Sequence, residues 1–144
     1  MQRIGRVEAR GNMRQWLRGA LAVAAGFIVW FAVATVGNFV IRWLVPSYSE
    51  VEKAMDFSLT MMVARLILGA IASLVAGAAC ITIARGTRPP VYVLVVLLLA
   101  LFVPVHVNLW AKFPAWYHIV FLSSLVVLVV LGARLGRSRT ASAV

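Results

Sequence analysis

The residues best suited to bind or transform a ligand are polar side chains within otherwise apolar stretches of the sequence. Arg65 is the most unusual of them. A charged side chain inside a membrane segment costs about 2.5–3.5 kcal/mol on insertion scales and is usually paired or functional. The other predicted ligand-binding residues are Asn38, Arg42, His106, Asn108 and His118. Such a set could hold an anionic or amphipathic ligand through ionic and hydrogen bonds.

Two structural explanations of Arg65 stay open beside ligand binding. The residue lies roughly 10 Å below the predicted start of its helix. A long side chain can recover that depth by extending toward the membrane surface. Arg65 could also form a structural ion pair with an acidic residue of the preceding loop, which contains Glu50, Glu52 and Asp56.

His106 and His118 raise the question of a metal or haem site, because they flank a short turn at matching depths. No carboxylate lies within a predicted span to complete a site for a hard metal ion, and Cys80 is predicted near the opposite end of the bundle. We therefore expect no metal ligand and no cofactor. A haem- or quinone-linked membrane subunit is kept as an alternative.

Motifs that support catalysis are missing from the sequence. There is no G-x-S-x-G motif, no pair of carboxylates within a span and no glycine-rich phosphate-binding loop. Proton-coupled transport normally needs a buried acid, and none of the four acids falls in a predicted span. We therefore expect no catalytic residue and a non-enzymatic protein.

These polar residues must be positioned by membrane-spanning helices. The chain has 144 residues, of which 63% are hydrophobic, and its mean hydropathy is +0.98. A small soluble domain cannot bury so much apolar surface, so the surface needs lipid. The sequence predicts an all-α membrane protein, a four-transmembrane-helix bundle. The predicted spans cover residues 19–45, 58–84, 91–110 and 114–133.

Segments between and around the spans carry the turn signals and most of the charge. Pro46 should end the first span, and the pair Pro89–Pro90 should reverse the chain before the third. Ser49 followed by Glu52 fits a capping box, which predicts a short surface helix starting at Ser49. Residues 1–18 form a basic segment, and residues 134–144 are expected to be a basic disordered tail.

The basic residues predict the orientation of the bundle. The net charge is +10, and ten of the fourteen basic residues would lie on one side of the membrane. The positive-inside rule makes this side cytoplasmic and places both termini there. This explanation of the charge leaves no need for nucleic acid as a partner. The ten residues are Arg3, Arg6, Arg10, Arg14, Arg18, Arg85, Arg88, Arg134, Arg137 and Arg139.

Two spacings predict surfaces for packing or association. Gly69, Ser73 and Gly77 recur every four residues and so share one helix face, which favours close helix packing within the bundle or a dimer. Arg3, Arg6, Arg10 and Arg14 recur every three or four residues. A basic face of this kind attracts anionic lipid headgroups. A membrane-protein partner or a second copy of the chain is also possible.

The last span begins Pro114-Ala115-Trp116-Tyr117 and ends Leu131-Gly132-Ala133-Arg134-Leu135. This segment, about the final quarter of the chain, resembles a loose group of small four-span bacterial inner-membrane proteins without assigned functions. The resemblance implies a multi-pass protein of a bacterial inner membrane. It implies no activity.

Three functions follow from these observations. The first is a non-enzymatic accessory or assembly subunit, or a helical bundle that interacts with lipid. The second is a binding or transport protein for an anionic or amphipathic ligand, through an externally facing polar cavity around Arg65. The third is the haem- or quinone-linked subunit.

Overall fold

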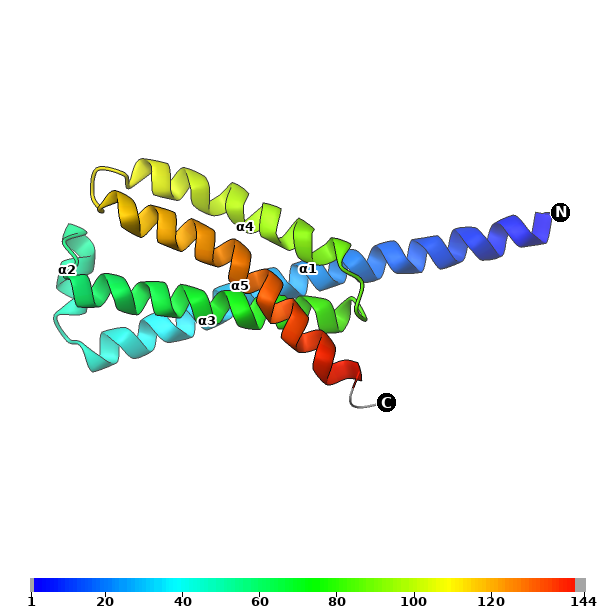
Figure 1. The fold of residues 1–144 in the computed structure, drawn as a ribbon, viewed down its shortest axis with the longest axis horizontal. Helices are drawn as coiled ribbons and strands as arrows, with labels where there is room; N and C mark the ends of the chain where they lie inside the picture. The colour runs from blue at the N-terminus through cyan, green and yellow to red at the C-terminus, as the bar shows by residue number, and fades with distance from the viewer. Residues whose placement is uncertain (1, 142–144) are drawn as a thin grey trace.

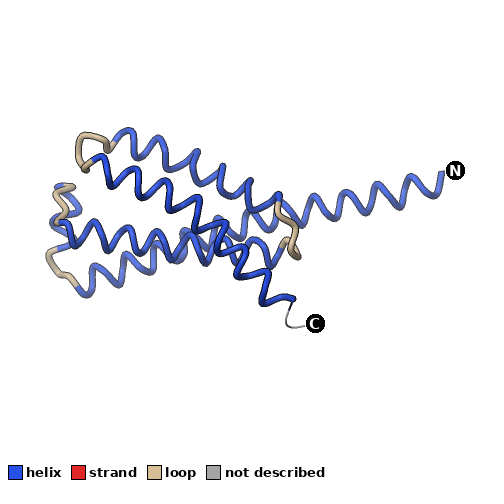
Figure 2. The backbone as a smooth tube through the Cα atoms, viewed as in Figure 1, coloured by secondary structure: helices blue, strands red, loops and turns tan. Residues whose placement is uncertain are grey.

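The computed structural model describes the backbone of residues 2–141 and the side chains of residues 12–138. This part of the chain forms five helices and no strand (Figures 1 and 2). The helices are α1 (Gln2–Leu44), α2 (Tyr48–Ala54), α3 (Leu59–Ile83), α4 (Pro89–Asn108) and α5 (Ala115–Ala141). All except α2 contain a segment long and apolar enough to cross a membrane. The predicted all-α fold with four spans is confirmed.

Prolines define the end of α1 and the start of α4. α1 ends at Leu44, two residues before Pro46, because the residue before a proline avoids the helical conformation. α4 starts at Pro89 and not at Val91 as predicted. Both prolines fit its first turn, where a backbone N–H would have no partner within the helix.

The predicted capping box at the start of α2 is wrong. The helix begins at Tyr48 with Ser47 at its N-cap, and Ser47 makes no side-chain capping bond. Ser49 therefore lies inside the first turn and cannot serve as the cap. The Glu52 carboxylate instead accepts hydrogen bonds from Arg42 of α1.

Helical structure extends beyond the predicted spans at both ends of the chain. α1 continues unbroken from residue 2, and its first turns project from the bundle (Figure 1). Within the predicted basic stripe, Arg14 is exposed, whereas the side chains of Arg3, Arg6 and Arg10 lie outside the described residues.

The predicted disorder of residues 134–144 is wrong for residues 134–141, which continue α5. Gly136 explains the difference. A Cβ atom there would lie 3.0 Å from the Cα atom of Ala78. α5 therefore still packs closely on α3 beyond the predicted end of the span, and this contact stabilises the extra turns. Residues 142–144 lie outside the described part of the chain.

The bundle has two chemically different ends (Figure 1). We call one the basic end: it holds the α3–α4 turn and the last turns of α5, with Arg85, Arg88, Arg134 and Arg137. We call the other the acidic end: it holds α2 and the α4–α5 turn, with Glu50, Glu52 and Asp56.

The α3–α4 turn at the basic end is a compact helix stop. The Gly86 amide donates to the Ile81 carbonyl oxygen at 3.0 Å, and the Arg85 amide donates to that of Thr82 at 3.1 Å. This pair of bonds is a Schellman motif. It requires the left-handed backbone that Arg85 adopts, with φ of 50°. Gly86 follows with φ of 82°, which glycine adopts without steric cost. The turn thereby fixes the entry of the chain into α4.

The closest helix contact in the bundle joins α3 to α5, and it depends on two glycines. A Cβ atom at Gly77 would meet the backbone of Val129, whose carbonyl carbon would be only 2.8 Å away. A Cβ atom at Gly132 would in turn meet the backbone of Leu74. Small residues permit this approach of two backbones. The main buried cluster surrounds the contact and extends to α1 and α4, with Ala22, Trp30, Ala72, Ala76, Cys80, Leu94, Leu98, Leu125 and Val129 among its members.

We predict that Gly77→Ala destabilises the bundle by about 1–3 kcal/mol, because the added methyl group forces two backbones apart. Thermal unfolding in mild detergent, followed by circular dichroism, measures the effect. Gly19→Ala is the matched control: its Cβ would meet only a side-chain atom of Pro90, at 3.6 Å. That variant should be as stable as the wild type or slightly more so, since alanine favours helix. Equal effects of both substitutions would contradict the proposed role of Gly77.

Candidate functional site

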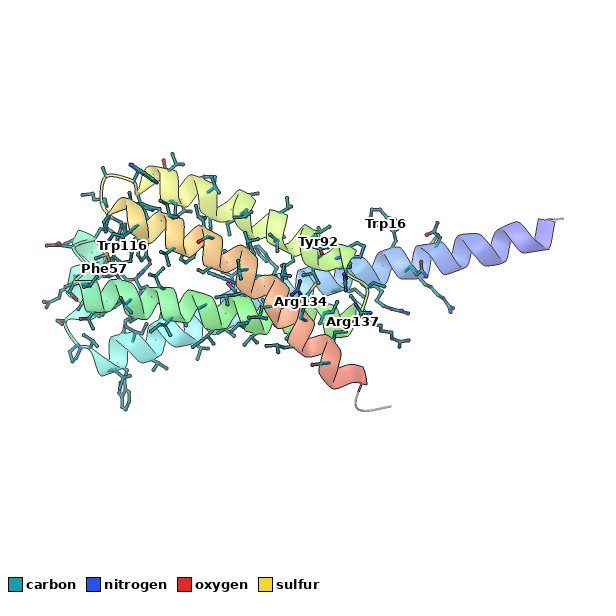
Figure 3. All side chains as sticks on the ribbon, in the orientation of Figure 1. Trp16, Phe57, Tyr92, Trp116, Arg134 and Arg137 are labelled. Carbon is teal, nitrogen blue, oxygen red and sulfur yellow. The ribbon has the colours of Figure 1, made fainter. Side chains whose placement is uncertain are left out.

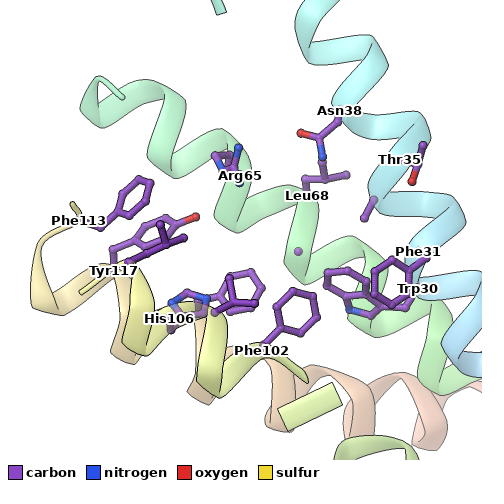
Figure 4. Close-up of a pocket in the computed structure, with 15 residues that line it drawn as sticks. Trp30, Phe31, Thr35, Asn38, Arg65, Leu68, Phe102, His106, Phe113 and Tyr117 are labelled. Atoms are coloured by element: carbon purple, nitrogen blue, oxygen red, sulfur yellow. The ribbon is translucent and has the colours of Figure 1, made fainter. Parts of the chain in front are cut away.

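A cavity of about 250 Å³ lies between the helices in the half of the bundle nearer the acidic end (Figure 4). Its walls come from all four long helices and from the α4–α5 turn. Six of its fifteen lining residues are aromatic. The aromatic side chains are Trp30, Phe31, Phe102, Phe113, Tyr117 and Phe121. The polar side chains are Thr35, Asn38, Arg65 and His106.

Arg65 is the charged group of this cavity. It projects from α3, and its Nη1 donates a 2.8 Å hydrogen bond to the hydroxyl oxygen of Tyr48. Its guanidinium carbon lies 4.8 Å from the centroid of the Phe57 ring, a distance at which a cation is attracted to an aromatic face. The hydroxyl group of Tyr117 points toward Arg65 from α5 (Figure 4). The charge is thus held among three aromatic rings, and its side chain remains 30% exposed.

Glu52 of α2 is shared unequally between two arginines. Its Oε2 lies 2.7 Å from Nη2 of Arg42, whereas its Oε1 lies 3.9 Å from Nη1 of Arg65. The short, doubly hydrogen-bonded contact therefore belongs to Arg42. Among these three side chains, two positive charges and one negative charge leave an excess of one positive charge beside the cavity. Of the three acids that the sequence offers as partners of Arg65, Glu52 is the one that approaches it.

Asn38 of α1 contributes a polar atom without a partner. Among the described residues, no group hydrogen-bonds its buried Oδ1 atom. An unpaired buried carbonyl oxygen costs about 1–3 kcal/mol. Since Asn38 lines the cavity together with Arg65, a ligand that brings a hydrogen-bond donor could satisfy this atom.

The two histidines form one buried pair across the α4–α5 turn. The Nδ1 atoms of His106 and His118 are 2.7 Å apart. One of them must donate and the other accept, so at least one ring is neutral. Nitrogen–metal bonds are about 2.0–2.1 Å long for zinc, so this spacing leaves no room for a metal ion between the two Nδ1 atoms. His106 lines the cavity, whereas His118 lies behind it against Trp110 and Phe113.

The structure brings together only part of the predicted ligand-binding set. Asn38, Arg65 and His106 line the cavity. His118 contacts His106, and Arg42 contacts Glu52, which also approaches Arg65. Asn108 is exposed and does not line the cavity. The reason is geometric: residues two positions apart point to nearly opposite sides of a helix, so Asn108 cannot share the face of His106.

The predicted packing stripe of Gly69, Ser73 and Gly77 runs along α3 from the cavity wall to the contact with α5. Gly69 itself lines the cavity and lies beneath the Phe121 ring. The Ser73 hydroxyl accepts a 3.1 Å hydrogen bond from the indole N–H of Trp30 and donates to the Gly69 carbonyl oxygen at 2.7 Å. Gly77 makes the backbone contact with α5. The three residues therefore lie in contacts within the bundle.

The cavity opens sideways and is closed at the acidic end. Its exposed lining residues are Phe31 and Thr35 of α1 and Val105 of α4, so the opening lies between these two helices. At the acidic end a second buried cluster covers it, formed by Tyr48, Phe57, Phe113 and Tyr117. The cavity is therefore more aromatic than the polar, externally open site that the sequence suggested, and it opens on a lateral face of the bundle.

Sequence reasoning missed most of the aromatic wall, although part of it carried a signal. Phe102 precedes His106 by four residues, and Tyr117 precedes Phe121 by four, so each pair shares a helix face. These spacings could have extended the predicted site. No local pattern could reveal Tyr48, because it meets Arg65 across a turn, 17 residues away along the chain.

We predict that Tyr48→Phe destabilises the protein by about 1.5–3 kcal/mol, since it removes a hydrogen bond to a charged, partly buried group. The thermal unfolding midpoint in detergent should fall clearly. Arg42→Gln breaks the more exposed ion pair and should cost less than about 1 kcal/mol. Tyr92→Phe, at an exposed tyrosine, controls for the loss of a phenol. A loss with Tyr48→Phe no larger than that with Tyr92→Phe would contradict the assignment of Tyr48 as the main partner of Arg65.

Comparison of the chain with protein-family models, with characterised proteins and with solved structures found no match. The resemblance of residues 114–135 to small four-span bacterial proteins stays a prediction. What is shown of this protein is its class: an all-α protein whose four long helices are apolar enough to span a membrane.

Proposed function

We propose that this protein is an integral membrane protein that binds an anionic amphipathic molecule without transforming it. The acidic head would contact Arg65, and the apolar tail would leave the cavity between α1 and α4. The observation that carries the proposal is a partly exposed arginine in a largely aromatic cavity that opens sideways between α1 and α4.

The head chemistry is supported by unused hydrogen-bonding capacity. A guanidinium group has five N–H donors arranged in a fork that matches a carboxylate or a phosphate. Tyr48 accepts a bond from one nitrogen, the Tyr117 hydroxyl also lies toward the guanidinium group, and Glu52 approaches the Tyr48-bound nitrogen only to 3.9 Å. Because Glu52 is bound mainly to Arg42, a second anion at Arg65 would balance the excess positive charge. Asn38 and His106 could add hydrogen bonds to the same head.

The tail chemistry is supported by the shape and composition of the walls. Small-molecule sites are mostly apolar concave surfaces with a few polar groups that orient the ligand. Phe31, Phe102 and Phe121 supply such a surface. The opening between α1 and α4 would let a chain extend into the bilayer, so the tail need not cross water to enter.

Binding is favoured over catalysis by the lining itself. Among the described residues that line the cavity there is no carboxylate, serine or cysteine, and the groups there that could exchange a proton, His106 and Tyr117, have no such nucleophile beside them in the lining. The exposed outer surface of α4, with Val93, Val96 and Val103, would suit lipid or a partner helix. A bound acidic lipid is therefore compatible with an accessory role in a larger membrane assembly.

We place the basic end in the cytoplasm. The described arginines of that end, with no described acid beside them, follow the positive-inside rule. The cavity would then lie in the outer leaflet half of a bacterial inner membrane. The acidic end would face the outside.

The proposal predicts where a photoactivatable fatty acid reacts. Protein in phosphatidylcholine vesicles is illuminated with a diazirine-labelled fatty acid, and labelled residues are mapped by mass spectrometry. Labels should concentrate on the cavity-facing residues of α1 and α4. Arg65→Gln should reduce labelling by roughly tenfold, in keeping with about 1.5–3 kcal/mol for a charged hydrogen bond.

Two further variants make the test specific. Arg42→Gln removes one positive charge outside the cavity and should leave labelling within about twofold of wild type, as for an exposed ion pair. Thr35→Trp blocks the side opening without touching Arg65 and should abolish labelling. Labelling spread evenly over the outer helix faces, or unchanged in Arg65→Gln, would refute this function. Unchanged labelling would favour a neutral ligand such as a quinone, or a protein partner.

A further inference from the structure

A second hollow lies at the basic end, far from Arg65. Its volume is about 370 Å³, and it is formed by α3, α4 and α5. Three arginines line it: Arg88 from the α3–α4 turn, and Arg134 and Arg137 from α5. Figure 3 shows Arg134, Arg137 and Tyr92 gathered at this end of the bundle.

The spacing of these residues gives the hollow two polar walls. Arg134 and Arg137 are three residues apart and so share one face of α5. Tyr92 lies four residues after Arg88, so it faces the same hollow one turn further along α4. The Arg137 Nε atom would lie 3.9 Å from a Cβ atom at Gly86, which places its side chain beside the α3–α4 turn.

No described carboxylate balances these charges. The acids whose side chains are described are Glu50, Glu52 and Asp56, and all three lie at the acidic end. Three guanidinium groups around one hollow repel one another unless an anion lies between them. Arginine forks match the oxygen atoms of a phosphate group.

Apart from Ser138 near the end of α5, the rest of the lining is apolar and belongs to the long helices. Ile81, Val91, Val130 and Ala133 form this part of the wall. The hollow therefore joins a cationic rim at the predicted membrane surface to an apolar floor that lies deeper. An inorganic ion would use only the rim, whereas a phospholipid would contact both.

We propose that this hollow is a binding site for an anionic phospholipid, whose phosphodiester group lies between Arg88, Arg134 and Arg137. Its acyl chains contact the apolar floor. The site differs from the cavity at Arg65 in position, in lining and in ligand class. It also differs from the basic stripe predicted on α1, because it is a hollow within the bundle and not a helix surface.

The full chain in mild detergent is titrated with phosphatidylglycerol or with phosphatidylcholine of the same acyl chains, and bound lipid is counted by native mass spectrometry. Wild-type protein should bind phosphatidylglycerol selectively. The double variant Arg134→Gln/Arg137→Gln should weaken this binding by roughly tenfold or more, as expected for two lost lipid–arginine contacts. The variant Arg134→Lys/Arg137→Lys keeps the charge but not the fork, and should lose only part of the affinity.

The matched control is Arg18→Gln/Arg85→Gln, which removes two arginines that neither line the hollow nor belong to the basic stripe predicted on α1. Its affinity for phosphatidylglycerol should stay close to that of the wild type. An equal loss in the control would show that overall charge, and not this hollow, attracts the lipid. Equal binding of both lipids, or displacement of phosphatidylglycerol by millimolar inorganic phosphate, would overturn the assignment to a phospholipid. If the glutamine variant loses its helical circular dichroism signal, the test depends on the lysine variant alone. Wild-type affinity of the lysine variant for phosphatidylglycerol would then overturn the proposed role of the arginine forks.

Discussion

Helices α3 and α5 touch backbone to backbone, where Gly77 faces Val129 and Gly132 faces Leu74. Nearer the acidic end, the neighbour of Gly69 is the ring of Phe121 and not a backbone. The two helices thus cross at Gly77 and Gly132 and lie further apart toward the acidic end (Figure 1). The Phe121 ring lies in this wider part, and both Gly69 and Phe121 line the cavity. The close crossing therefore accounts for the position of the candidate site.

Electrostatics at the acidic end follow from one short helix. α2 places Glu52 against Arg42 and the buried Tyr48 against Arg65. If Glu52 were bound tightly to Arg65, the two side chains would form a structural ion pair. The 3.9 Å separation, together with a neutral partner at 2.8 Å, keeps a net charge beside the cavity. The arrangement stabilises a partly buried cation without neutralising it, and this favours an interpretation of Arg65 as a ligand-binding group.

The two ends of the bundle offer complementary sites for amphipathic molecules. The cavity near the acidic end has one arginine within aromatic walls, and it opens between α1 and α4. The hollow at the basic end has three arginines around an aliphatic floor. The first suits a single acidic head with a slender tail, and the second suits a phosphodiester. Both proposals rest on the same constraint: a cation in or near a membrane needs either a partner within the protein or an anion from outside.

Hydropathy and prolines in the sequence were enough to predict four spans and most helix ends, because apolar length and the missing proline N–H act locally. The sequence also singled out Arg65 and His106, since polar residues are rare inside such spans. Tertiary structure alone decided that Asn108 points away, that Tyr48 and not an acid holds Arg65, and that His106 bonds His118. It also decided that α5 continues past Ala133, through the contact of Gly136 with α3. These features depend on helix rotation and on contacts between residues far apart in the chain, and both are fixed by packing rather than by local sequence.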